Sequence, residues 1–353
     1  MFPIEFPLSI LKPRAAPGHR VLDPFCGRGT TNFAARLLGL ESLGVDSSSV
    51  AVAITAAKLA MTTVDDIVLE AQAILDTSTN TPVPDGEFWR WAYHPDVISA
   101  LSRFRAAFLS DCSTPARIAL RGVILGALHG PKQKTFPSYF SNQCPRTYAP
   151  KPAYAIRYWR DRRLVPEAMD VLAVIERRAK RYYSELPDVT GRVRLADSRA
   201  VGALISEVPE ALFHWVITSP PYYGMRTYIP DQWIRNWFVG GKDAVDYTSR
   251  DQVVHSSPED FVTDLRRVWC NVAKVCADEA TMVIRFGSIA DRNAAPLELI
   301  KNSLSKSDWR IMTIHHAGSA SAGKRQADAF LRTKTKAMVE YDIWARKRSR
   351  PTG

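Results

Sequence analysis

The stretch HRVLDPFCGRGTT, residues 19–31, decides the fold. Its first seven residues are mostly apolar and read as a buried strand, and the Gly-x-Gly turn that follows opens a helical run at residues 32–40. Residues 42–46 repeat the strand pattern, and a serine-capped, alanine-rich helix follows at residues 48–61. A strand-helix-strand-helix beginning is the mark of an α/β sheet.

The sheet pattern then stops for a long interval. Residues 64–187 read as helices broken by a proline-rich basic loop, without strand alternation. Strands resume at residues 193–197, 214–219, 281–287, 309–318 and 337–347. We therefore expect an α/β protein with a Rossmann-like, seven-stranded sheet and a mostly helical basic insertion. Residues 1–63 and 188–353 would be the two halves of one domain, and residues 64–187 would be the insertion.

Composition excludes several classes of protein. The 353 residues are 46% hydrophobic, which is ample for a large core. No window approaches the roughly 18 uninterrupted apolar residues of a membrane span, and the first residues lack the basic region and cleavage site of a signal peptide. We therefore expect a cytoplasmic protein without a membrane partner. The five cysteines are an odd number without CxxC spacing, which argues against a disulfide framework and a zinc site.

The charge favours a polyanionic partner. The chain carries a net charge of +11, and residues 132–181 supply +8 of it, with 12 Lys and Arg against 4 Asp and Glu. Aromatic residues lie among these cations. Because cations neutralise phosphates and aromatic faces stack on bases, nucleic acid is the leading candidate and the insertion is a candidate recognition region. A solvated basic helix beside a proline-rich loop is the alternative interpretation.

Two glycines and an acid indicate a nucleotide-like ligand. Gly27 and Gly29 have no Cβ, so a ligand can approach the backbone of the turn closely. Asp46 ends the second strand about 20 residues later, where α/β nucleotide-binding folds place an acid on ribose hydroxyls. Taken alone, the turn could be a tight strand-to-helix connection and Asp46 could be a helix N-cap.

A second stretch, TSPPYYGMRTY at residues 218–228, directly follows the apolar run FHWVI. Two prolines fix its backbone and remove donors, so a buried strand ends in a rigid, aromatic elbow. DPFCGRGTT and TSPPYYGMRTY together resemble the amino-methyltransferase family that methylates cytosine N4 or adenine N6 in DNA with S-adenosylmethionine. The resemblance implies a methyltransferase sheet and S-adenosyl-L-methionine as the cofactor.

The resemblance also implies which residues bind the cofactor. The family's DPFxGxGT motif is matched by Asp23, Pro24, Phe25, Gly27, Gly29, Thr30 and Thr31. Asp46, with Ser47, would hold the ribose hydroxyls. Asp197 and Ser198, in LADSR, resemble a third cofactor motif, in which Asp197 would meet the adenine amino group. Phe6 lies in a segment resembling the one that packs over the methionine moiety.

The family's [DNS]PP[YFW] motif, which holds the target base, is matched by Ser219, Pro220, Pro221 and Tyr222. Such enzymes flip the base out of the duplex into a pocket. Ser219 and the carbonyl of Pro220 would accept the two amino N–H bonds, and Tyr222 would stack on the base. Proximity and alignment would carry the catalysis, without a strong general base.

The resemblance implies a DNA cytosine-N4 methyltransferase acting on double-stranded DNA, in a restriction-modification or related defence system, for which a cognate restriction endonuclease is a candidate partner. The SPPY motif is the version most associated with N4-cytosine enzymes. N6-adenine methylation, RNA guanine-N2 methylation and a binding-only role are the alternatives; adenine enzymes typically carry Asp or Asn where Ser219 stands. Lys324, Arg325 and Gln326, in a later loop, are candidates to reach DNA.

Overall fold

The computed structural model of the protein describes residues 2–77, 81–130, 139–142, 151–201, 212–224, 229–245, 257–287, 295–319 and 339–349. The chain forms two compact units. The first, here called the sheet unit, comprises Met1–Thr55, Pro187–Arg226 and Asp251–Gly353. The second, here called the helical unit, comprises Ala56–Leu186 and Thr227–Arg250.

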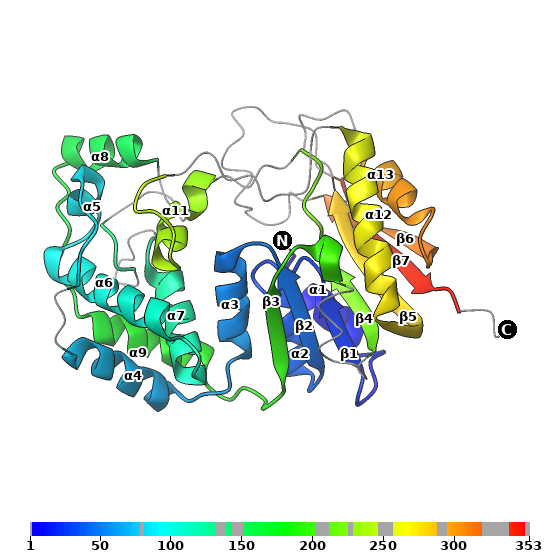
Figure 1. Cartoon of the computed structure of the whole chain (residues 1–353), viewed down its shortest axis with the longest axis horizontal. Coiled ribbons are helices and arrows are strands. Elements are labelled where there is room, and N and C mark those ends of the chain that lie inside the picture. Colours follow the sequence, from blue (N-terminus) through cyan, green and yellow to red (C-terminus); the bar gives the residue numbers. More distant parts are fainter. Residues whose placement is uncertain are drawn as a thin grey trace. The chain divides into compact units, whose positions relative to one another are not determined.

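The sheet unit contains a seven-stranded sheet in the order β3-β2-β1-β4-β5-β7-β6 (Figure 1). Its strands are β1 (Arg20–Asp23), β2 (Glu41–Asp46), β3 (Gly191–Leu195), β4 (Phe213–Thr218), β5 (Cys276–Gly287), β6 (Trp309–Ser319) and β7 (Val339–Lys347). Neighbouring strands are parallel from β3 to β5, and β7 runs antiparallel to both β5 and β6. The predicted Rossmann-like, seven-stranded α/β sheet is confirmed.

The strand order reverses between β1 and β4. Val21 of β1 pairs with Ser42 of β2 on one side and with Trp215 of β4 on the other, so the chain builds outward in both directions from this pair. In open α/β sheets the crevice for a ligand lies outside the carboxyl ends of the strands at such a switch point. The two motifs singled out in the sequence follow these two strands.

Both faces of the sheet are buried at its centre, at β1 and β4. Leu22 and Val216 belong to one hydrophobic cluster, whereas their chain neighbours Val21 and Ile217 belong to another. This alternation follows from the two-residue period of a strand and explains why adjacent residues of β1 and of β4 are both apolar. Helices α12 and α13 supply the first cluster, and α1 and α2 supply the second.

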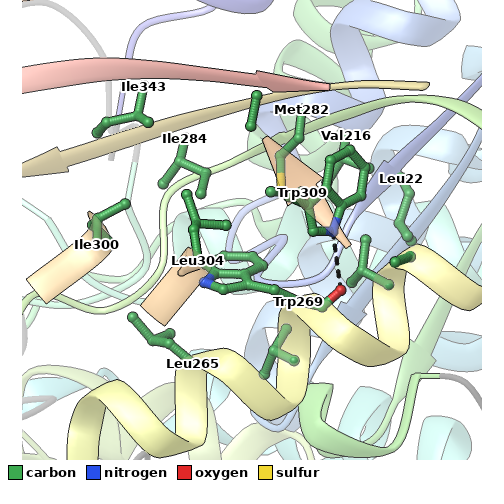
Figure 2. Close-up of a cluster of buried hydrophobic side chains, with 14 of the residues drawn as sticks. Leu22, Val216, Leu265, Trp269, Met282, Ile284, Ile300, Leu304, Trp309 and Ile343 are labelled. Atoms are coloured by element: carbon green, nitrogen blue, oxygen red, sulfur yellow. Dashed lines mark hydrogen bonds between the residues drawn. The ribbon is translucent and has the colours of Figure 1, made fainter. Parts of the chain in front are cut away.

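Two tryptophans anchor the first cluster, shown in Figure 2. The Nε1 of Trp309 donates to the carbonyl of Trp269 at 3.0 Å, and the Nε1 of Trp269 donates to the Ser303 hydroxyl at 2.9 Å. Each buried indole N–H therefore has an acceptor, which removes the cost of placing a polar atom in the core.

The helices of the sheet unit are α1 (Glu5–Leu11), α2 (Thr30–Leu37), α12 (Pro258–Lys274), α13 (Pro296–Leu304) and the short 3-10 helix η1 (Ser198–Ala200). Helix α3 (Ser49–Leu59) crosses from the sheet unit into the helical unit. Ser257 caps α12 by accepting from the Asp260 N–H at 3.0 Å, and Pro258 begins the helix. Hydrophobic periodicity did not single out α12, although this Ser-Pro-Glu-Asp start is a recognisable capping signal.

The helical unit is built from α4 (Val64–Asp76), α5 (Glu87–Ala92), α6 (Pro95–Ser110), α7 (Pro115–Ala127), α8 (Pro152–Asp161), α9 (Val171–Tyr182) and α11 (Ile229–Phe238). Asp170 caps α9 by accepting from the Ala173 N–H at 3.0 Å. Across the described parts of both units, no helix combines the length and apolar character needed to cross a membrane.

Candidate active site

The turn after β1 requires its two glycines for different reasons. Gly27 and Gly29 have φ angles of 51° and 67°, in the left-handed region that favours glycine. A Cβ at Gly29 would also stand 2.7 Å from the Thr55 side chain. Gly29 precedes α2, so the turn presents backbone close to a helix N-terminus. This arrangement lets a ligand approach the main chain without a side chain in between.

Asp46 ties this turn to the end of β2. One carboxylate oxygen accepts from the Gly27 N–H and the other from the Ser48 N–H, each at 2.9 Å. The carboxylate thus closes the turn and holds the chain that leads to α3. Asp46 is not the N-cap of α3, because the helix begins at Ser49 and the Ser48 hydroxyl accepts from the Ala51 N–H at 3.3 Å. Burial raises the pKa of Asp46, and the two backbone hydrogen bonds oppose that rise. Each oxygen retains capacity for a further donor.

Asp23 links the carboxyl ends of β1 and β4. Its side chain accepts from the Thr218 hydroxyl at 2.7 Å and from the Phe25 N–H at 3.1 Å, and the residue is 2% exposed. Burial raises the pKa of Asp23 to about 6, although the hydrogen bond from Thr218 lowers it. Asp23 therefore joins the two motifs through the residue that immediately precedes Ser219.

Other residues of the predicted cofactor set also hold the turn in place. The Thr31 hydroxyl donates to the Ile217 carbonyl at 3.0 Å, and the Ser198 hydroxyl donates to the Pro24 carbonyl. Phe25 packs edge-on against Trp269, with ring centroids 6.1 Å apart. These contacts attach the turn to β4, η1 and α12. Thr30 begins α2, and Ser47 is exposed beside Asp46.

Asp197 is engaged by an arginine that the sequence reasoning did not single out. It caps η1 by accepting from the Arg199 N–H at 2.8 Å, and the Arg199 guanidinium lies 2.6 Å from its Oδ2. The same guanidinium contacts Asp264 of α12 at 3.0 Å. Hydrogen bonds from Arg199 lower the pKa of Asp197. Arg199 follows Asp197 by two residues in the LADSR segment, so the signal was present in the sequence.

Phe6 lies among core residues rather than at an exposed position. It is 7% exposed, and the Arg285 guanidinium stands 3.6 Å from its ring centroid. Arg285 of β5 in turn makes two hydrogen bonds of 2.7 Å to Asp342 of β7, its direct partner in the ladder. The structure therefore places Phe6 against β5, whereas the other predicted cofactor residues gather after β1, β2 and β3.

The elbow after β4 turns its first tyrosine into the core. Tyr222 is 7% exposed, its ring meets Phe286 at 5.2 Å edge-on, and its hydroxyl donates to Glu340 at 2.7 Å. Glu340, at the start of β7, is itself 4% exposed. Gly287 makes room for both, since a Cβ there would stand 2.9 Å from Glu340 and 3.3 Å from Tyr222. Sequence reasoning missed Glu340, which no local pattern connects to the elbow.

The rest of the elbow is less deeply packed. Ser219 and Pro221 are half-buried and Pro220 is buried. Tyr223 is half-buried, with its ring edge-on to Phe261 at 5.5 Å. Residues 225–228, the remainder of the quoted motif, and Lys324, Arg325 and Gln326 lie outside the described residues. The edge of the sheet thus carries the glycine turn, Asp46 and the Ser-Pro-Pro elbow on neighbouring strands.

A comparison with known protein families covers part of this edge of the sheet. Residues 1–57 match a family described as DNA methylase, the N6_N4_Mtase family. The matched stretch contains the turn after β1 and Asp46 and ends before the elbow. No curated protein matches the chain.

The solved structures found by comparison share little sequence with the chain. The rRNA methyltransferase aviRa from Streptomyces viridochromogenes is 13% identical, with 98% of this chain and 85% of that chain covered and a TM-score of 0.34. A SAM-dependent methyltransferase from Methanosarcina mazei is 8% identical, with 99% of each chain covered and a TM-score of 0.37. An rRNA methylase from Streptococcus thermophilus is 8% identical, with 99% and 98% covered and a TM-score of 0.37.

Proposed function

We propose that this chain is an S-adenosylmethionine-dependent DNA methyltransferase that methylates the exocyclic N4 of a flipped-out cytosine. One observation carries the proposal: the glycine turn after β1 and the Ser-Pro-Pro elbow after β4 are neighbours at the switch point of the sheet, joined by the Thr218–Asp23 hydrogen bond of 2.7 Å. The match of residues 1–57 to a DNA methylase family supports the cofactor half.

The residues after β1 and β2 suit the proposed cofactor. Gly27 and Gly29 leave the backbone open to close approach, and the free lone pairs of Asp46 suit the two hydroxyls of a ribose. Asp197 would accept from the adenine amine while Arg199 keeps its carboxylate ionised. The cofactor would supply an electrophilic methyl group on a sulfonium.

The elbow would orient the amine. The Ser219 hydroxyl and the Pro220 carbonyl would each accept one amino N–H, which turns the nitrogen lone pair towards the methyl group. Transfer would form the N–CH₃ bond as the sulfonium S–CH₃ bond breaks, leaving a neutral thioether, and the extra proton would then leave the nitrogen for water. Tyr222 would hold the elbow rigid through Glu340; stacking on the base requires its ring to leave Phe286.

Ser219 favours cytosine because it is a short, neutral acceptor. Adenine N6 is the second candidate, since the matched family is named for both amines. We assign residues 64–187 to recognition of double-stranded DNA, and we place the protein in a restriction-modification or related defence system with a cognate endonuclease. The charge excess of residues 132–181 supports a DNA partner.

The test is the product. Genomic DNA from cells expressing the chain, digested to nucleosides and analysed by mass spectrometry, is expected to contain N4-methylcytosine. Ser219→Ala should reduce it strongly by removing one of the two acceptors. Asp46→Ala should reduce it by weakening S-adenosylmethionine binding more than about tenfold, as expected for lost hydrogen bonds to a charged group.

Other products would redirect the proposal in defined ways. N6-methyladenine would overturn the choice of base and leave the site intact. N2-methylguanine in RNA, with DNA unmodified, would overturn the DNA assignment. Cofactor binding without methylation of either nucleic acid would favour a binding-only role.

A further inference from the structure

One face of α8 combines stacked aromatic rings with a cation. Tyr154, Tyr158 and Arg162 lie four residues apart and therefore share a face of the helix. The two rings are inclined by 25° with centroids 6.4 Å apart, and the Arg162 guanidinium stands 4.2 Å from the Tyr158 centroid. Tyr154 is 45% exposed, whereas Ala155 and Trp159 are buried on the other side. The Tyr154 ring is therefore accessible, Tyr158 is half-buried, and the tryptophan is not accessible.

The same segment is strongly basic. Residues 151–163 contain five Lys and Arg against one acid, Asp161. Arg160 forms an ion pair with Glu87 of α5, within the helical unit. Arg157, Arg162 and Arg163 are exposed beside the two tyrosines. The charge complements a phosphate backbone, and the positions of the rings allow a base to stack.

Arg163 occupies a backbone position that favours glycine. Its φ is 52°, in the left-handed region. The Leu164 N–H bonds the Trp159 carbonyl at 2.9 Å and the Arg163 N–H bonds the Arg160 carbonyl at 3.1 Å, the paired bonds of a Schellman motif. Glycine is the usual residue at this position of the motif. An arginine here keeps a positive charge beside the two tyrosines at a cost in backbone strain.

We propose that Tyr154, Tyr158, Arg157, Arg162 and Arg163 form a DNA-binding face, in which the arginines contact phosphates and Tyr154 stacks on an unpaired base. This inference rests on the proposed function for the choice of DNA as the ligand. It narrows the predicted DNA-contacting region from the 50 residues 132–181 to α8 and its C-terminal cap. It leaves out Trp159, which is fully buried, and Arg160, which is held by Glu87.

Binding of the full chain to fluorescent duplexes, with and without one unpaired base, tests the face. Wild type is expected to bind the unpaired-base duplex more tightly, and Tyr154→Ala should weaken that complex about tenfold and reduce the preference to the part that the elbow supplies. Arg157→Gln, Arg162→Gln and Arg163→Gln should each flatten the log-log salt dependence by about 0.9. Arg160→Gln is the matched control, with a smaller change expected.

The strained arginine provides a second readout. Arg163→Gly should raise the melting temperature by about 2 °C because the backbone strain is relieved, while weakening DNA binding. Glu185→Gly is the matched control, since Glu185 has a φ of 56° in the same unit. It should also raise the melting temperature, without loss of DNA affinity. Arg163→Lys should keep both the strain and the binding.

The outcomes separate this inference from the proposed function. Unchanged salt dependence in all three arginine variants would overturn the phosphate contacts, and equal binding of both duplexes by wild type would overturn the stacking. Tighter binding of an RNA hairpin than of either duplex would overturn the DNA assignment. S-adenosylmethionine affinity is expected to be unchanged in every variant. If wild type binds DNA through these arginines and yet transfers no methyl group, the proposed methyltransferase function is refuted and the DNA-binding face is not.

Discussion

The turn after β1 and the elbow after β4 stand on neighbouring strands, yet they are held in different ways. The turn is shaped by backbone: two left-handed glycines and amide N–H groups bonded to Asp46. The elbow is shaped by side chains: Tyr222 is fixed in the core by Glu340, 118 residues away along the chain. A turn shaped by backbone sterics can be built locally, whereas an elbow held by a distant side chain depends on packing.

The largest expected effect tests the turn. Gly29→Val should lower the free energy of unfolding by about 3 kcal/mol, because left-handed strain of about 1–2 kcal/mol adds to overpacking against Thr55. Gly39→Val is the control, since Gly39 has a φ of 72° and no atom within 4 Å of its would-be Cβ. Denaturant unfolding that shows equal losses in both variants would mean that the contact with Thr55 is unimportant.

The next prediction concerns Asp23, the link between the two regions. Its pKa is raised from 3.8 to about 6 in the folded protein, so the folded state binds more protons than the unfolded state between these values. The contribution of Asp23 to stability is therefore present below about pH 4 and lost as the pH rises through about 6, by up to about 3 kcal/mol.

Asp23→Asn removes this titration while keeping an oxygen that can accept from Thr218. The free energy of unfolding of the variant, relative to that of wild type, should therefore rise between about pH 4 and about pH 7. Denaturant unfolding at a series of pH values across this range measures the difference. A difference that does not change with pH would show that Asp23 titrates normally and that the link is solvated.

The smallest expected effect tests the elbow. Tyr222→Phe keeps the ring against Phe286 and removes only the donor to Glu340, which should cost about 1.5 kcal/mol of unfolding free energy. Glu340→Gln should cost less, because the amide oxygen can still accept from the phenol. If Tyr222→Phe proves neutral while Glu340→Gln destabilises, the hydroxyl does not hold the elbow and the ring is free to turn towards a base.

Much of the fold and part of the site could be predicted from the sequence because their signals are local. The apolar residues of β1 and β4 predict strands buried on both faces. Gly29 indicates a left-handed turn at a position where a side chain would not fit. The acid at the end of β2 was recognisable by its spacing from the glycines. Each of these features is determined within about 20 residues of chain.

Contacts between distant parts of the chain were decided by tertiary structure alone. No pattern in the sequence indicates that Trp233 packs on Trp89, with centroids 5.3 Å apart, or that Arg105 donates to the Trp237 carbonyl at 2.7 Å, although these contacts draw Thr227–Arg250 into the helical unit.

By itself, the sequence determined where the strands lie, where the backbone must bend and which polar groups end each strand. Only the tertiary structure decided which candidates are accessible: it buries Tyr222 against Glu340, pairs Asp197 with Arg199 and leaves Tyr154 on the surface. The physical reason is that secondary structure follows from periodicity and backbone sterics over a few residues. Burial and pairing of a side chain depend on partners that the fold brings from far along the chain.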